Sequence, residues 1–287
     1  MLTVRRPTPI KQVKINMISM ALLLGGLLLI PPVVSQAGLL ELTGSFTQGG
    51  LIMGRTEPGA RITLDGQPVR VSPTGAFVIG FDRDAPAGAR LETTFRNGSR
   101  EQRTLTIKPR RYQVQRISGL PEEKVTPPPE VMGRIQREKA QLQEARSRDI
   151  DTAYFLSGFT WPVNGRISGI FGSQRILNGE PRQPHYAIDI AATAGTPVKA
   201  PADGVVTLAQ PDLYFTGGTL IVDHGYGLSS LFAHLQEIYV RPGQTVKQGQ
   251  TIAAVGATGR AAGPHLHWGL NWLNRHLDPA LLLMPPH

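Results

Sequence analysis

The sequence predicts a mainly β protein with an N-terminal immunoglobulin-like β-sandwich, a helical connector and a C-terminal β domain. Three observations predict it: hairpin signals in residues 40–115, a helix-forming stretch after a proline run, and short β-branched segments between glycines in the second half. The 287 residues are enough for about two domains. An apolar fraction of 40% is typical of folded, soluble domains.

Residues 1–37 are typical of a secretory signal peptide. Four basic residues precede an apolar run over residues 17–30, and Ser35-Gln36-Ala37 follows as a small-x-small cleavage pattern. The alternative is an uncleaved membrane anchor, because the apolar stretch, extended through Val34, approaches the ~20 residues that span a bilayer. Both interpretations predict that the chain is exported.

The composition narrows the possible chemistry and partners. The chain has no cysteine, which excludes disulfides and thiolate metal ligands. The whole chain has 30 basic and 21 acidic residues. Residues 1–37 hold four of the basic residues and no acidic one, so the rest of the chain has 26 basic and 21 acidic residues and a net charge of +5. That surplus favours association with an anionic polymer such as a cell wall. We expect no nucleic-acid partner, because the sequence has no basic stripe interleaved with aromatic residues.

Residues 38–118 are predicted to form the β-sandwich. Asp65-Gly66 lies between two alternating segments, residues 61–64 and 69–71, and Asn97-Gly98 lies between two more. Asp-Gly and Asn-Gly between such segments are strong signals for a tight hairpin turn. No catalytic constellation is present here, so we expect a spacer or binding module of immunoglobulin-like type.

Residues 119–155 are predicted to be a proline-rich linker and a connector helix. Thr126-Pro127-Pro128-Pro129 opens the helical stretch, which runs from Glu130 to about Arg148. Opposite charges four residues apart, as in Arg134 and Glu138, support a helix. Its many charges indicate a solvated face, so we assign the helix a positioning role.

Residues 156–287 are predicted to form the C-terminal β domain. Its strongest candidates for a functional site are His185, Asp189, His265 and His267. In an extended strand, residues two apart share a face, so His265 and His267 project together, as do His185 and Asp189. A catalytic zinc site takes three nitrogen or oxygen ligands and keeps one open position, which two imidazoles and one carboxylate satisfy. Spacing does not decide which member of the H-x-H pair holds the metal. His234 is a further candidate.

The order of motifs in residues 159–280 resembles the lysostaphin-type (LytM-like) zinc endopeptidases that cut cell-wall peptides. The motifs are Phe171-Gly172, His185-x-x-x-Asp189, Gly195-Thr196-Pro197-Val198, Ala202-Asp203-Gly204-Val205, Ala233-His234-Leu235, Gly249-Gln250, Val255-Gly256, Thr258-Gly259 and Gly263-Pro264-His265-Leu266-His267. The resemblance implies a compact, mostly antiparallel β domain (a duplicated hybrid motif) with a long open groove. It also implies zinc on His185, Asp189 and His267, with His234 and His265 as catalytic histidines that do not bind the metal.

The function that the resemblance implies is that of an exported zinc metalloendopeptidase of the periplasm or cell envelope. It would hydrolyse the peptide cross-links of peptidoglycan, whose peptide stems are the expected partner. The sequence has no H-E-x-x-H motif, so histidine must replace the glutamate base of that class. The alternative is a non-enzymatic, wall-binding regulator of another cell-wall hydrolase, with its groove covered by the connector helix.

Two further polar positions have weaker interpretations. Asn178 resembles a position where the family has an additional polar residue near the zinc. Asp223-His224-Gly225 also invites a metal interpretation. We favour a structural role for it, as the end of a strand before a glycine turn.

Overall fold

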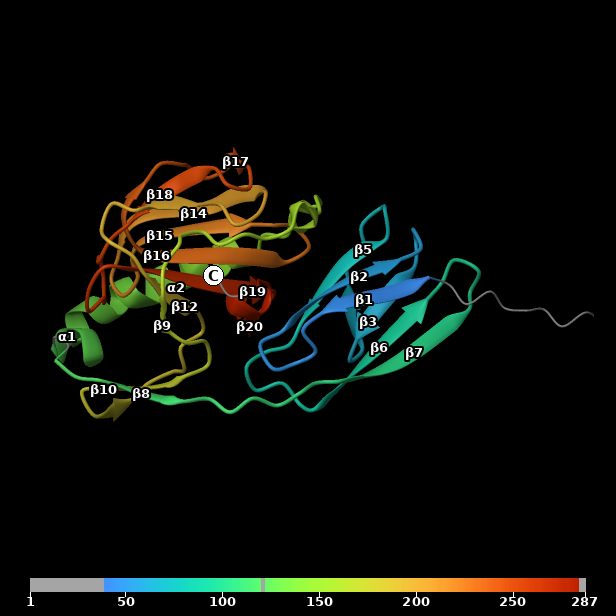
Figure 1. Cartoon of the computed structure of the whole chain (residues 1–287), viewed down its shortest axis with the longest axis horizontal. Coiled ribbons are helices and arrows are strands. Elements are labelled where there is room, and N and C mark those ends of the chain that lie inside the picture. Colours follow the sequence, from blue (N-terminus) through green and yellow to red (C-terminus); the bar gives the residue numbers. More distant parts are fainter. Residues whose placement is uncertain (1–38, 120–121, 284–287) are drawn as a thin grey trace, which may run out of the picture. The chain divides into compact units, whose positions relative to one another are not determined.

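The computed structural model describes residues 39–119 and 122–283 and consists mainly of β-strands (Figure 1). The predicted fold class is confirmed at this level. The predicted signal peptide or anchor, residues 1–37, lies outside the described residues. Within the described ranges, no helix combines the length and apolarity needed to cross a bilayer. The domain boundaries stay a prediction.

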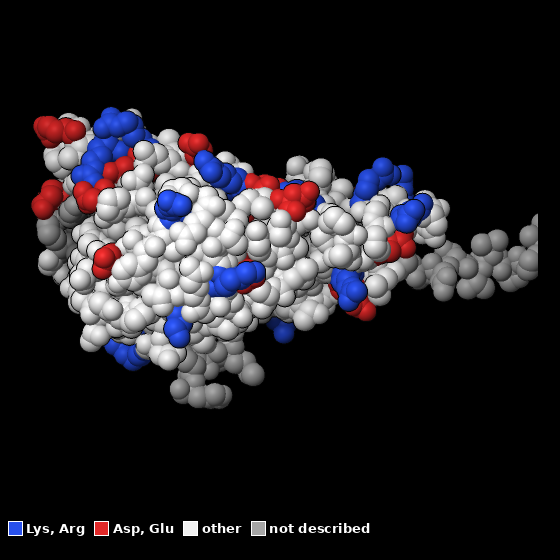
Figure 2. Space-filling view, turned by 90° about the horizontal axis from the view of Figure 1, so that it is seen from above, with Lys and Arg blue, Asp and Glu red and all other residues white. Residues whose placement is uncertain are grey.

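Charged side chains of both signs are interspersed on the face shown in Figure 2. Lysine and arginine gather in places on this face, but acidic side chains lie next to them. The distribution on this face agrees with the modest positive charge of the sequence without residues 1–37.

Residues 40–106 form two antiparallel sheets, with strand orders β1-β2-β5 and β4-β3-β6-β7. Asp65 and Gly66 form the turn from β3 to β4, with φ values of 51° and 78°, and Gly98 lies in the β6–β7 turn with φ 83°. Both predicted hairpins are therefore confirmed, and the immunoglobulin-like type stays a prediction. The strands are β1 (Leu40–Gly44), β2 (Leu51–Thr56), β3 (Arg61–Leu64), β4 (Gln67–Val69), β5 (Ala76–Gly80), β6 (Gly88–Thr94) and β7 (Arg100–Thr106).

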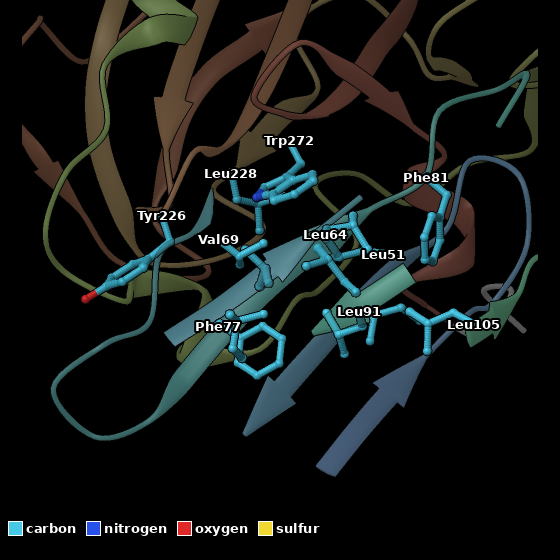
Figure 3. Close-up of a cluster of buried hydrophobic side chains, with 14 of the residues drawn as sticks. Leu51, Leu64, Val69, Phe77, Phe81, Leu91, Leu105, Tyr226, Leu228 and Trp272 are labelled. Atoms are coloured by element: carbon cyan, nitrogen blue, oxygen red, sulfur yellow. The ribbon is translucent and has the colours of Figure 1, made fainter. Parts of the chain in front are cut away.

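Apolar side chains of these two sheets share one buried core (Figure 3). Phe77 and Leu91 are completely buried. The Phe77 ring lies over Gly54 of the paired strand, where an added Cβ would come within 2.1 Å of the ring. The same core includes Leu228 and Trp272 from the second half of the chain, so burial of apolar area stabilises both halves together.

The connector contains strand β8 (Val114–Ile117) and helices α1 (Glu122–Val125) and α2 (Pro129–Ser147). The predicted connector helix is confirmed, and a proline at its first position fits the helix start because that amide needs no partner. Arg134 forms ion pairs with Glu138 and with Asp212 of strand β14 (Gly204–Leu213). Ala145 is buried against the sheet. These contacts hold α2 against the C-terminal half.

The C-terminal half is built on a ten-stranded sheet whose main path is β17-β14-β15-β16-β19-β12-β9. Its pairings are antiparallel, as predicted. A separate small sheet has the order β11-β10-β8. The remaining elements are η1 (Tyr154–Ser157), β9 (Ile167–Gly169), β10 (Gln174–Leu177), β11 (Glu180–Pro181), β12 (Ile188–Ala191), β13 (Pro197–Lys199), β14 (Gly204–Leu213), β15 (Gly217–Asp223), β16 (Leu228–Ile238), β17 (Thr245–Val246), β18 (Thr251–Val255), β19 (His265–Trp272), β20 (Arg275–Leu277) and η2 (Pro279–Leu281).

His224, directly after β15, is completely buried with both ring nitrogens hydrogen-bonded. Nδ1 donates to the Asp203 carbonyl at 2.7 Å, and Nε2 accepts from the Ser230 hydroxyl at 2.8 Å. Burial lowers the pKa of His224 to about 4. These contacts support the structural role that we favoured for the Asp223-His224-Gly225 segment.

His224 should make folding stability depend on pH. The folded pKa is about 4 and the ordinary value 6.5, so the unfolded chain binds the additional proton between these values. The free energy of unfolding should therefore fall as pH is lowered across this window. In His224→Asn, whose amide can still donate to Asp203, this contribution, on the order of 1 to 3 kcal/mol, should be missing. Urea unfolding with chelator present, at several pH values, measures it. Equal pH slopes for variant and wild type would contradict the assignment.

Candidate metal centre

Three neighbouring strands of the large sheet position most of the candidate site. Asp189 of β12 lies opposite His267 of β19, and on the other side of β19, Ala233 of β16 lies opposite the same His267. Side chains directly opposite in antiparallel strands project from the same face, so Asp189 and His267 meet there. His185 joins them from the segment before β12.

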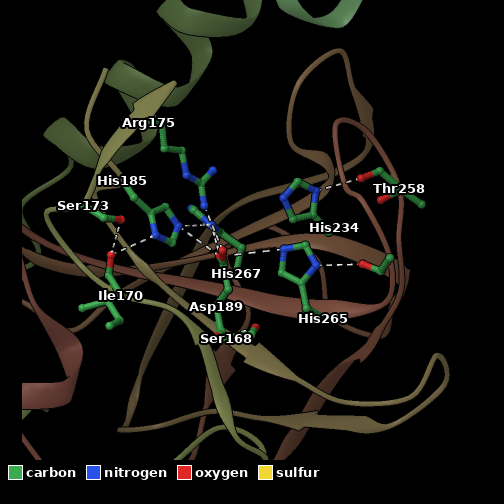
Figure 4. Close-up of polar contacts among 11 residues, drawn as sticks. Ser168, Ile170, Ser173, Arg175, His185, Asp189, His234, Thr258, His265 and His267 are labelled. Atoms are coloured by element: carbon green, nitrogen blue, oxygen red, sulfur yellow. Dashed lines mark hydrogen bonds and ion pairs between the residues drawn. The ribbon is translucent and has the colours of Figure 1, made fainter. Parts of the chain in front are cut away.

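The side chains of His185, Asp189 and His267 converge on one point (Figure 4). Their candidate ligand atoms all lie within 4.8 Å of one another. Asp189 Oδ1 is 2.8 Å from His267 Nδ1 and 3.0 Å from His185 Nε2, and the two nitrogens are 3.2 Å apart. The structure thus brings together the three residues that were predicted to bind zinc.

The chemical state of these groups fits a zinc ion. His185 Nδ1 donates to the Ile170 carbonyl at 3.3 Å, which directs the lone pair of Nε2 toward Asp189. Burial lowers the pKa of His185 to about 4, so its imidazole is neutral at neutral pH. Burial alone would raise the pKa of Asp189, but its close contacts with His185 and His267 outweigh burial and hold the pKa of Asp189 well below its usual range. Two imidazole nitrogens and one carboxylate oxygen are a donor set that zinc takes.

The orientation of the Asp189 carboxylate is set by residues that the sequence analysis missed. Arg175 of β10 donates from Nη2 to Asp189 Oδ2 at 2.9 Å. Gly169 of β9 pairs with Asp189, and a Cβ at position 169 would lie 2.2 Å from Oδ2. No pattern in the sequence indicates either contact, because both depend on which strands become neighbours.

His234 lies at an irregularity of β16. Its backbone φ is +61°, in the left-handed region that non-glycine residues seldom adopt, and the β15–β16 register shifts beside it. Such bulges redirect side chains near functional sites. The ring donates from Nδ1 to the Thr258 carbonyl at 2.8 Å. Burial, together with the nearby His267 and His265, lowers the pKa of His234 to about 3.

His265 lies beside His234, with ring centroids 4.8 Å apart. Its Nδ1 donates to the Gly263 carbonyl at 2.8 Å, and its Nε2 is 3.7 Å from Asp189 Oδ1. In Figure 4, His234 and His265 lie on one side of Asp189 and His185 lies on the other. Both histidines therefore have Nδ1 bound to a carbonyl, which leaves Nε2 for other partners.

Two cavities border these residues. The larger, of about 830 Å³, is lined by His185, His234 and His267, and the smaller, of about 360 Å³, by Asp189, His234 and His265. Helix α2 also lines the larger cavity, through Ile135, Glu138, Lys139, Leu142, Gln143 and Arg146. These residues of α2 therefore form one wall of the cavity. The many charges of the helix had predicted only a solvated face.

Asn178 lies in the exposed turn between β10 and β11, with φ 48°. Its backbone amide donates to the Ile117 carbonyl at 2.8 Å. Its resemblance to an additional polar residue near the zinc stays a prediction. Arg175 of the preceding strand is the residue that contacts Asp189.

Comparison with known proteins places these motifs in one family. Residues 183–279, which include all five candidate residues, match the model of peptidase family M23. A crystal structure of an M23 peptidase from Pseudomonas aeruginosa is 32% identical, covers 82% of this chain and 94% of that one, and has a TM-score of 0.64. The chain belongs to peptidase family M23. The predicted resemblance to lysostaphin-type peptidases is thereby confirmed.

This M23 chain is also similar to curated relatives with named activities. A Vibrio cholerae protein, peptidoglycan DD-endopeptidase ShyB, is 36% identical over 144 residues, which are 48% of this chain and 30% of that protein. A Neisseria meningitidis protein, DD-carboxypeptidase/endopeptidase Mpg, is 36% identical over 123 residues, 43% of this chain and 28% of that protein. The chain thus spans less than a third of either relative.

Replacing Gly169 should weaken metal binding at the M23 site. In Gly169→Ala, the new Cβ would overlap Asp189 Oδ2 and turn the carboxylate away, so we expect zinc affinity to fall by about 10- to 100-fold. Competition with a chromophoric chelator measures the affinity. Gly88→Ala is the matched control, because its Cβ would meet no atom closer than 4.0 Å. Equal zinc affinity in both variants would show that Gly169 does not position Asp189.

Proposed function

We propose that the protein is a zinc metalloendopeptidase that hydrolyses the peptide cross-links of peptidoglycan. The convergence of His185, Asp189 and His267, with His234 and His265 beside them, carries the proposal. Membership of family M23 supports a peptidase. The names of the Vibrio and Neisseria relatives support peptidoglycan as the substrate.

In this proposal, His185 Nε2, Asp189 Oδ1 and His267 Nδ1 hold the zinc ion. When bound, zinc polarises the scissile carbonyl and lowers the pKa of a bound water to about 7. The Ile170 carbonyl keeps His185 in the tautomer whose Nε2 lone pair faces the site. Arg175 holds the second carboxylate oxygen of Asp189, so Oδ1 stays directed at the two imidazoles.

His234 and His265 move the protons of the reaction. Their Nδ1 hydrogens are held by the carbonyls of Thr258 and Gly263, so each Nε2 is the nitrogen that can accept a proton. Hydrolysis takes a proton from the attacking water and delivers one to the leaving amine. The unusual backbone of His234 brings its ring within 4.8 Å of the His265 ring, so both can reach the same bond.

The proposed place of action is the cell envelope or periplasm. It follows from the predicted signal peptide or anchor in residues 1–37 and from the cell-wall substrate of the named relatives. The β-sandwich of residues 40–106 supplies part of the core shared with the C-terminal half, so it would position the catalytic groove on the wall.

Single substitutions should separate the two groups of histidines. His267→Ala should lose both zinc and the release of cross-link fragments from peptidoglycan, because one of three ligands is gone. His265→Ala should keep its zinc and lose about 10²- to 10⁴-fold in kcat, which is typical of a lost proton-transfer group. Metal analysis and mass spectrometry of digested peptidoglycan measure both effects.

The control is wild-type protein stripped by chelator, which should regain activity when zinc is returned. Thermal unfolding of each variant shows whether it is folded. Undiminished hydrolysis by His267→Ala, or by the stripped enzyme, would contradict the proposed function.

A further inference from the structure

The large cavity beside the candidate metal centre has an unbalanced charge. Its lining includes five basic side chains, Lys139, Arg146, Arg175, Arg182 and Arg260, against two carboxylates, Asp82 and Glu138. Glu138 is bonded to Arg134 and to the Tyr214 amide, and Asp82 accepts from the amides of Arg83 and His276. Both carboxylates are therefore engaged by groups outside the basic set.

Three of the four arginines that line this cavity have a hydrogen-bond donor without a partner among the described residues. The Nε atoms of Arg146, Arg175 and Arg182 are buried and have no hydrogen-bond partner among the described residues. Buried donors in folded proteins are almost always satisfied, and leaving one without a partner costs stability. Three arginines that line the cavity therefore have guanidinium groups whose hydrogen-bonding capacity is only partly used within the described residues.

Arg175 and Arg182 lie close enough to Arg260 for their charges to act on it. Arg260 has its pKa lowered chiefly by burial and further by the charges of Arg175 and Arg182. Its guanidinium lies 4.5 Å from the centre of the Phe215 ring, which fixes its position. Like charges gathered away from water repel one another unless an anion lies among them.

The arginine cluster reaches the reacting groups. Arg175 and Arg260 border both cavities, together with His234, and Arg175 also contacts Asp189. A substrate peptide with its scissile bond at His234 and His265 would therefore place the adjacent residue among these arginines.

We propose that Arg175, Arg182 and Arg260 form a subsite for a substrate carboxylate on the carbon next to the scissile nitrogen. Guanidinium groups bind carboxylates through paired hydrogen bonds, which suits three arginines that line one cavity. A cross-link from D-alanine to diaminopimelate has such a carboxylate on its leaving residue, and a bond inside a neutral peptide has none. The inference rests on the proposed function and specifies its substrate class.

A pair of substrates tests the subsite. Two cross-linked peptides are compared that differ only in this carboxylate, which is free in one and a carboxamide in the other. The purified wild-type chain should cleave the free acid with a kcat/KM at least about tenfold higher, because a neutral carboxamide cannot form charge-assisted hydrogen bonds to the guanidinium groups. Arg182→Gln and Arg260→Gln should bring the ratio toward one, mainly through loss on the free acid. Arg241→Gln, at an exposed position, is the control and should keep the wild-type ratio.

The outcomes separate this inference from the proposed function. Equal kcat/KM values of the wild type on both peptides would overturn the subsite and leave the hydrolase intact. Failure of the zinc-loaded wild type to cleave either peptide or peptidoglycan would overturn both. Zinc content and thermal unfolding are measured for each variant, and if a variant does not fold, the wild-type comparison alone decides.

Discussion

The Asp189 carboxylate is the group on which the whole candidate site depends. One of its oxygens contacts His185 and His267, and the other accepts from Arg175. A buried carboxylate is costly unless it is paired, and here pairing outweighs burial, since the pKa lies well below its usual range. Gly169 leaves the space that the carboxylate occupies. The Asp189 side chain thus contacts both His185 and His267, and it fits only because Gly169 of the neighbouring strand β9 has no side chain.

The sheet gives the two histidines of β19 different surroundings. His267 lies opposite Asp189 in the β12–β19 pairing, whereas His265 lies opposite Ala191. His267 is therefore held directly against the carboxylate at 2.8 Å, and His265 remains 3.7 Å away, beside His234. In the proposed function, one strand supplies both a metal ligand and a proton-transfer group, because its pairing places the two histidines at different distances from the same carboxylate.

Local patterns predicted much of the fold, and contacts between distant segments could not be predicted. Asp65-Gly66 and Asn97-Gly98 specify tight turns through their own backbone preferences, so the hairpins followed from the sequence. The H-x-H and H-x-x-x-D spacings identified the residues that converge. The spacing alone did not show whether His265 or His267 is the metal ligand. The strand register distinguishes them, because it places His267 opposite Asp189. Arg175 was missed because its contact with Asp189 depends on the path of β10, and the charges of α2 did not show that it lines a cavity.

The most direct test of this account is a crystal structure of the zinc-loaded protein with anomalous diffraction measured at the zinc absorption edge. The account predicts one strong anomalous peak within bonding distance of His185, Asp189 and His267, with His234 and His265 nearby but outside it. A peak bound by His265 in place of His267, or no peak at these residues, would contradict it.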